Sequence, residues 1–193
     1  MSALTTTPPP VAHKRLFTVA EYYRMAEAGI LTEDDRVELL EGEITAMSPL
    51  GSRHAASVNR LANLLFEAVH GSALVAVQNP IRLSPRSEPQ PDLTLLKPRA
   101  DFYASAHPGP EDVLLLIEVA ESSASHDRDT KFPIYARAGI SECWLADLDA
   151  RHVEIHRQPA PDGYRDVQRL APGQALTCLA LPGLRIRVED VLV

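Results

Sequence analysis

Two acidic residues stand in positions from which their side chains could act on a substrate. Glu118 lies inside the apolar run DVLLLIEVA at residues 112–120, and an unpaired charge buried there would cost several kcal/mol. Asp92 follows Pro91 at the start of another short apolar segment. Taken alone, Glu118 could form a salt bridge with an arginine or lie on an edge strand, and Asp92 could be a turn residue bonded to its own backbone.

The two carboxylates together are more informative than either alone. If their strands are neighbours, the side chains can share one Mg²⁺ ion, which takes oxygen ligands and keeps water molecules for exchange. Such an ion polarises a phosphate and lowers the pKa of its bound water, so it supplies what phosphodiester hydrolysis needs. A nearby lysine would complete the set. These residues predict a metal-dependent hydrolytic site.

The elements that position these residues follow from the spacing of apolar side chains. Apolar residues at helical intervals predict helices at 19–28, 54–70 and 129–138, and the last would have Lys131 at its N-terminus. A hairpin is expected at 36–47, turning at Gly42. Further strands are expected at 73–83, 91–96, 112–120, 141–148, 151–157 and 164–170. This order predicts an α/β (α+β) fold with a mixed central β-sheet flanked by helices, and with residues 112–120 at the centre of the sheet.

The composition is that of an ordinary globular protein. Of 193 residues, 45% are hydrophobic and 23% are charged, which argues against disorder. Residues 1–14, with three consecutive prolines, are expected to be a flexible tail, and residues 15–193 a single domain. No apolar run is long enough for a membrane span and no signal peptide is evident, so a cytoplasmic location is expected. Cys143 and Cys178 suggest buried apolar residues, as does Trp144.

The formal charge of −7 argues against a nucleic-acid partner, because binding to DNA depends on basic surface that displaces counterions from phosphate. A local group of basic side chains around the binding site would still be enough to bind DNA. The candidates for such a lining are Arg82, Arg86, Lys97, Arg99, Arg128 and Lys131.

Several short motifs give the chain a family resemblance that spans about Leu16 to Val191. The motifs are VELLEGEI (37–44), MSP (47–49), QPD (90–92), EVAESS (118–123), DRDTKFPIYARAGI (127–140) and ECWLADL (142–148). In their order and spacing they resemble the Uma-type restriction endonucleases of the PD-(D/E)XK nuclease superfamily. The resemblance implies a restriction-endonuclease-like core built from a helix, three strands, a helix and a strand.

The resemblance also implies roles for particular residues. Asp92 and Glu118 would be the two metal ligands of the motif, for Mg²⁺ or Mn²⁺ as a substitute. The basic superfamily pattern has a lysine two positions after the glutamate, where this chain has Ala120. Lys131 looks like the relocated lysine, and it would stabilise charge in the transition state. The alternative for Lys131 is a solvated lysine at a helix end.

Three further residues fall at positions that the family resemblance highlights. Asp127 could contribute to the site, but an acid ahead of a helix is equally an N-terminal cap or a partner for Lys131. Glu38 could add a carboxylate, and His54 could contact a phosphate or assist proton transfer. Their simpler roles are a salt bridge on a strand face and a polar residue in the first turn of a helix.

Three functions remain open at this point. The first is a metal-dependent endonuclease that acts on double-stranded DNA, plausibly as a homodimer because two strands must be cut. The second is a catalytically weak or inactive nuclease-fold protein that serves as a nucleic-acid-binding or regulatory module. The third is an enzyme that uses the same site on RNA or branched DNA.

Overall fold

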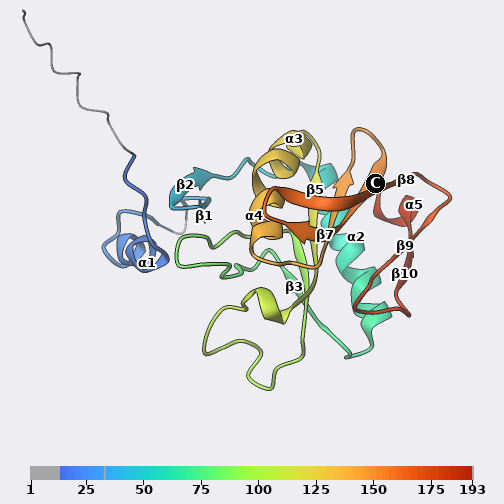
Figure 1. Ribbon diagram of the computed structural model, residues 1–193, viewed down its shortest axis with the longest axis horizontal. Coiled ribbons are helices and arrows are strands. Elements are labelled where there is room, and N and C mark those ends of the chain that lie inside the picture. Colours follow the sequence, from blue (N-terminus) through green and yellow to red (C-terminus); the bar gives the residue numbers. More distant parts are fainter. Residues whose placement is uncertain (1–13, 33, 193) are drawn as a thin grey trace, which may run out of the picture.

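The structure, a computed structural model, describes residues 14–32 and 34–192 (Figure 1). The tail predicted at 1–14 lies, apart from Lys14, outside the described residues. In chain order the elements are α1 (Val19–Glu27), β1 (Val37–Leu40), β2 (Glu43–Ala46), α2 (Ser52–Val69), β3 (Leu74–Val77), β4 (Leu93–Leu96), the 3-10 helix η1 (Pro110–Asp112), β5 (Val113–Ala120), α3 (Ala124–His126), the π-helix η2 (Asp127–Lys131), α4 (Phe132–Arg137), β6 (Glu142–Asp147), β7 (His152–Ala160), β8 (Gly163–Leu170), β9 (Ala175–Thr177), β10 (Arg185–Arg187) and α5 (Val188–Val191).

A six-stranded sheet in the order β3-β4-β5-β6-β7-β8 forms the centre of the molecule. β5 and β6 are parallel, and the other neighbouring pairs are antiparallel. The predicted fold class, a mixed sheet with flanking helices, is therefore confirmed. β5 is an interior strand, buried along almost its whole length, as its continuous apolar run predicts.

The two faces of the sheet are covered by different helices (Figure 1). One face packs against α2 and α5 through a core that includes Leu61, Leu65 and Trp144. The other packs against α4, with Phe132 and Tyr135 in its core. Each such buried large side chain contributes about 1.5–3 kcal/mol relative to an exposed one. Both faces are therefore held firmly, and the strand ends between them are fixed in position.

The register of β4 and β5 brings the two predicted ligands to the same place. Leu93 is paired with Ile117 in this antiparallel ladder, so one residue further along Asp92 lies opposite Glu118. Directly opposed residues of an antiparallel pair project from the same face. The expectation of neighbouring strands is confirmed for β4 and β5, and Asp92 lies directly before β4 rather than in it.

The helix that carries Lys131 begins earlier than predicted. α3, η2 and α4 follow one another without a break from Ala124 to Arg137. Lys131 is the N-cap of α4, so the expectation that it occupies a helix N-terminus holds for α4 but not for the whole helical segment. The Phe132 amide donates to the Asp127 carbonyl oxygen, five residues back. Pro133 has no amide hydrogen to donate, so it is compatible with this wider π turn.

Other differences from the sequence prediction have local causes. The strand expected at 73–83 ends at Val77, because Gln78 takes a left-handed backbone conformation with φ 51° and Pro80 cannot donate to a ladder. β9, β10 and α5 were not predicted. These elements are too short to show a periodic pattern of apolar residues in the sequence. β9 and β10 form a separate two-stranded sheet.

The N-terminal elements agree with the sequence prediction. Thr18 and Glu21 form the expected capping box of α1. β1 and β2 pair as a hairpin, and the turn residue Gly42 has φ 86° and packs so closely on Leu16 and Phe17 that a Cβ atom would collide with them. Across residues 14–32 and 34–192, no helix combines the length and apolar character needed to cross a membrane.

Candidate active site

Residues from five separate segments line one pocket at the end of the sheet where β4 begins and β5 ends. This acidic pocket, of about 150 Å³, contains all six residues singled out from the sequence. They are Glu38, His54, Asp92, Glu118, Asp127 and Lys131. The structure thus brings together positions up to 93 residues apart in sequence, although most of them have simpler roles when considered alone.

Asp92 is held by three donors. Its Oδ2 accepts hydrogen bonds from His54 Nε2 at 3.0 Å and from the Val119 amide at 2.9 Å. Its Oδ1 accepts from Gln78 Nε2 at 3.1 Å. Burial tends to raise the Asp92 pKa, but these hydrogen bonds outweigh it and the pKa is lowered. Asp92 is therefore an oriented carboxylate, and Oδ1 retains a lone pair for another partner.

His54 lies in the first turn of α2, as predicted, and it is buried. The hydrogen bond with Asp92 raises its pKa. Nδ1 is buried and has no hydrogen-bond partner among the described residues. His54 contacts Asp92 rather than projecting freely into the pocket, so its main effect is to fix the orientation of the carboxylate.

Glu118 is almost fully buried and has two donors on one oxygen. Its Oε1 accepts from Tyr135 Oη at 2.5 Å and lies 2.8 Å from Lys131 Nζ. The pKa of Glu118 is raised to about 8, chiefly by burial; Lys131 lowers it, whereas the carboxylates of Asp127 and Asp92 also raise it. Lys131 and Tyr135 therefore do not fully offset the cost of burying the Glu118 charge.

Lys131 is buried between two carboxylates, at 2.8 Å from Glu118 Oε1 and 3.4 Å from Glu38 Oε2. Burial acts to lower its pKa, but Glu118, Glu38 and Asp127 outweigh this effect and the pKa is raised. Lys131 is thus a fixed positive charge. A solvated lysine at a helix end, the alternative left open by the sequence, is excluded by its 5% exposure.

Glu38 reaches the pocket from β1. Its Oε2 also accepts a hydrogen bond from the Gln90 amide at 3.0 Å, so the QPD segment and the hairpin are joined at the site. The carboxylate is buried. The simpler expectation for Glu38, a salt bridge on a strand face, is half correct, because the ion pair with Lys131 exists but lies inside the pocket.

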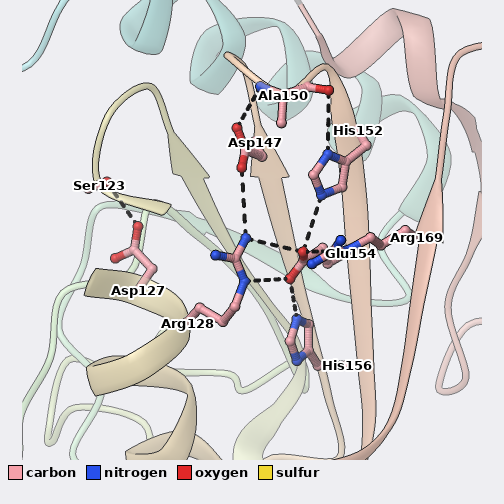
Figure 2. Close-up of polar contacts among 9 residues, drawn as sticks. All are labelled: Ser123, Asp127, Arg128, Asp147, Ala150, His152, Glu154, His156 and Arg169. Carbon is pink, nitrogen blue, oxygen red and sulfur yellow. Dashed lines mark hydrogen bonds and ion pairs between the residues drawn. The ribbon is translucent and has the colours of Figure 1, made fainter. Parts of the chain in front are cut away.

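Asp127 lies in the first turn of η2, inside the helical segment, so it is not the N-terminal cap of the helix. Ser123 Oγ donates to its Oδ2 at 2.9 Å (Figure 2). Burial raises its pKa, although Lys131 and Ser123 lower it. Asp127 and Lys131 begin and end the same π turn, and both line the pocket.

Tyr135, Gln78 and Gln90 are residues of the site that sequence reasoning missed. Tyr135 donates to Glu118, Gln78 donates to Asp92, and Gln90 Nε2 bonds to the Gln78 carbonyl oxygen. Gln90 stands in the QPD motif and Tyr135 in the motif DRDTKFPIYARAGI. Their place in these motifs could have marked Gln90 and Tyr135 as candidates, but nothing in the sequence indicated which acidic side chains they contact.

The charge and chemistry of the pocket fit a hard cation. Five carboxylates line it, those of the four acids above and of Glu121, against one lysine. In the part of the chain that the structure describes, no group of three or more His, Cys, Asp or Glu side chains is arranged to hold a metal. Asp92 and Glu118 could supply two carboxylate ligands to such an ion, and Mg²⁺ commonly keeps several waters beside one or two carboxylates.

The basic residues named as candidates for a DNA-binding lining are not gathered at this pocket. Of the six candidates only Lys131 lines it. Arg82 pairs with Glu88, Arg99 with Asp101 and Arg128 with Glu154. The sequence shows how many cations the chain has, but their positions depend on the tertiary fold.

Comparison with known proteins was made on sequence and on structure. A family model with the description "Uma2: Putative restriction endonuclease" matches residues 19–189. Among solved structures, the chain is similar to a "putative nuclease belonging to DUF820" from Anabaena variabilis, with a TM-score of 0.70 and 17% identity over 91% of this chain and 97% of that one. No match was found among curated proteins. At such low identity the structural likeness concerns the fold alone.

Proposed function

Since the chain belongs to the Uma2 restriction endonuclease family, we propose that it is a metal-dependent endonuclease that hydrolyses phosphodiester bonds of double-stranded DNA in the acidic pocket. The observation that supports this most is the convergence of Asp92, Glu118 and Lys131 on one pocket. Asp92 and Glu118 would hold Mg²⁺, or Mn²⁺ in its place.

The need for a cation follows from the charge of the substrate. A phosphodiester is an anion, and the pocket that would receive it has five carboxylates. Without a cation, the repulsion between these charges would oppose binding. When bound, a divalent cation acts as a Lewis acid towards the phosphate and the attacking water.

The residues of the chain prepare the site for this reaction. His54, Gln78 and the Val119 amide orient Asp92, and Tyr135 orients Glu118. Hydrolysis forms one bond from phosphorus to the water oxygen and breaks one to a sugar oxygen, which leaves with a proton. Negative charge grows on the phosphate oxygens, and the fixed charge of Lys131 stabilises it.

The test is cleavage of supercoiled plasmid by the purified protein with Mg²⁺, with Mn²⁺ and with EDTA. The proposal expects nicked or linear product with either metal, none with EDTA, and none from Asp92→Ala or Glu118→Ala. Cutting that persists in both variants would point to a contaminating nuclease. Absence of cutting by the wild type with both metals would contradict the proposal.

A second function, a nucleic-acid-binding or regulatory protein without turnover, is favoured by one observation. The ion pair between Lys131 and Glu118 already occupies Oε1, one of the two carboxylate oxygens of a proposed metal ligand. On this alternative the wild type binds duplex DNA in a mobility-shift assay, but it does not cut with either metal and gives no heat of Mg²⁺ binding.

A further inference from the structure

A second depression lies on the other side of the helical segment that carries Lys131. This arginine pocket has a volume of about 380 Å³. Its lining comes from η2 and the start of α4, from β7 and from β8, and consists of Arg128, Phe132, Pro133, Glu154, His156, Asp162, Gly163, Tyr164, Arg165, Val167 and Arg169. Three arginines in one pocket are a local exception in a chain with a net charge of −7.

Glu154 holds two of these arginines in place (Figure 2). The side chain is 1% exposed. Arg128 donates to both of its carboxylate oxygens, each at 3.1 Å, and Arg169 Nε donates to Oε1 at 2.9 Å. His152 and His156 reach the same carboxylate at 3.2 and 2.9 Å. The Glu154 pKa is lowered, because these hydrogen bonds outweigh burial, so Glu154 is a permanent anion that orients the guanidinium groups.

The arginines keep donors that Glu154 does not use. Arg128 Nη1 and both Nη atoms of Arg169 donate no hydrogen bond to any residue in the described ranges. Arg165 is exposed and forms no ion pair within the described part of the chain. The pocket is thus lined by three guanidinium groups and two carboxylates, those of Glu154 and Asp162. Arg128 Nη2 also lies 3.8 Å from Asp147 Oδ2, which is not part of the lining. The surplus of positive charge and the planar donors suit an anion with several oxygens.

We propose that the arginine pocket binds a backbone phosphate of the DNA substrate, away from the phosphate that is cut. This inference rests on the proposed function and extends it by assigning a second contact. Asp127 and Lys131 line the acidic pocket, and Arg128, from the same π turn, lines the arginine pocket. One helix is about 10–12 Å thick, which equals about three base-pair steps of roughly 3.4 Å each. One duplex can therefore reach both pockets.

The arginine pocket also accounts for an otherwise unfavourable charge distribution. The acidic pocket repels DNA until a cation is bound, and the chain as a whole is acidic. A phosphate contact at Arg165 and Arg169 supplies affinity that does not depend on the metal. It also fixes the position of the backbone, which is the usual effect of contacts to phosphate.

The experiment measures binding of a fluorescein-labelled DNA duplex by anisotropy over a range of salt concentrations, in EDTA, so that neither the metal nor cleavage contributes. The variants are Arg165→Ala, Arg165→Glu and the double variant Arg165→Ala/Arg169→Ala. Arg165 has no ion pair to lose, so its removal does not disturb the fold. The control is Arg24→Ala, which removes an exposed arginine on α1, distant from β8 (Figure 1).

The expected result is that Arg165→Ala weakens binding roughly five- to tenfold and lowers the slope of log Kd against log salt by about 0.9, the value for one lost phosphate contact. Arg165→Glu should weaken binding further, the double variant should lose about two contacts, and Arg24→Ala should match the wild type. Equal affinity and slope in the double variant and the wild type would overturn the inference, as would a wild type that does not bind the duplex. The proposed function is tested by separate measurements. It fails if the wild type neither cuts plasmid with Mg²⁺ nor binds Mg²⁺.

Discussion

Glu118 and Glu154 are the same residue type, and both are buried on interior strands of one sheet. Yet the pKa of Glu118 is raised and that of Glu154 is lowered. Burial acts to raise the pKa of each. At Glu118 the neighbouring carboxylates reinforce this effect, and the pKa rises to about 8. At Glu154, two arginines and two histidines donate to the carboxylate and its pKa is lowered.

This difference distinguishes a carboxylate whose charge is balanced by cations of the chain from one whose charge is not. Glu154 has its counter-charges within the chain, and what remains is a surplus of cationic donors that favours an external anion. The acidic pocket around Glu118 has a surplus of carboxylates, which favours an external cation. The two pockets lie on either side of one helical turn, so they would be complementary to the proposed substrate, an anion that a metal helps to cut.

The largest effect is expected from Glu118→Gln or Asp92→Asn, which remove a charged ligand with little change in shape. Since metal activation contributes several kcal/mol, kcat for Mg²⁺-dependent cleavage should fall by about a thousandfold or more. Plasmid cleavage under single-turnover conditions measures this. Glu121→Gln, on the rim of the same pocket, is the control and should keep most of the activity. A Glu118→Gln variant within tenfold of the wild type would show that the acidic pocket needs no ligand at that position.

Lys131→Met should lower kcat by about a hundred- to a thousandfold, because a fixed charge that acts in the transition state is lost. Mg²⁺ affinity should be kept or increased, since one positive charge leaves a pocket of carboxylates. Cleavage rates and calorimetric titration of the same preparation separate the two effects. Lys97→Met, at an exposed lysine, is the control. Loss of metal binding together with loss of rate would mean that Lys131 serves the fold alone.

Glu154→Gln should lower the free energy of unfolding by about 2 kcal/mol, because Arg128, Arg169 and the buried His156 lose their charged hydrogen-bond partner. The stabilisation by Glu154 is present above the ordinary carboxyl pKa near 4.5 and is lost as the pH falls below it, since the pKa in the folded state is lowered. Urea unfolding at neutral and acidic pH should therefore show a smaller difference between variant and wild type in acid.

The control for this prediction is Glu41→Gln, which removes an exposed ion pair with Arg137 and should cost under about 1 kcal/mol. An equal loss in the two variants would mean that burial of the Glu154 cluster adds nothing to its stability. A difference between Glu154→Gln and wild type that grows in acid would contradict the sign given above.

The smallest effect is expected from Tyr135→Phe, which removes the hydroxyl that orients Glu118. Groups that hold a metal ligand in place typically change metal affinity by about 10- to 100-fold, and we expect the lower end because Lys131 still contacts the carboxylate. Calorimetric titration with Mg²⁺ measures this. Tyr22→Phe, whose hydroxyl bonds to the Val37 carbonyl oxygen, is the control. An unchanged affinity for Mg²⁺ would leave Tyr135 as a core residue only.

Much of the fold could be predicted from local patterns. The capping box of α1, the hairpin turn at Gly42 and the continuous apolar run of β5 are properties of short segments, and each was confirmed. The family match over residues 19–189 confirms the motif resemblance. The start of the helix at Ala124 was missed, because the π turn breaks the periodicity on which such a prediction depends.

The candidate site was predictable only in part. Its carboxylates and Lys131 were named from burial and from motif spacing, and the structure places them in one pocket. Tyr135 and Gln78 were not named, because their roles depend on contacts between distant segments. The positions of the arginines could not be predicted from the sequence either. Arg128 was one of six candidates for a basic lining, and only the structure shows that it contacts Glu154.

The central claim is that the acidic pocket is a cation site made by Asp92 and Glu118, and calorimetric titration with Mg²⁺ in the absence of substrate tests it most directly. We expect saturable binding to the wild type at millimolar or lower concentrations, and loss of that binding in both Asp92→Asn and Glu118→Gln when thermal unfolding shows that the variants are folded. A wild type that binds no Mg²⁺ in this range, or folded variants that bind it as tightly as the wild type, would contradict the account.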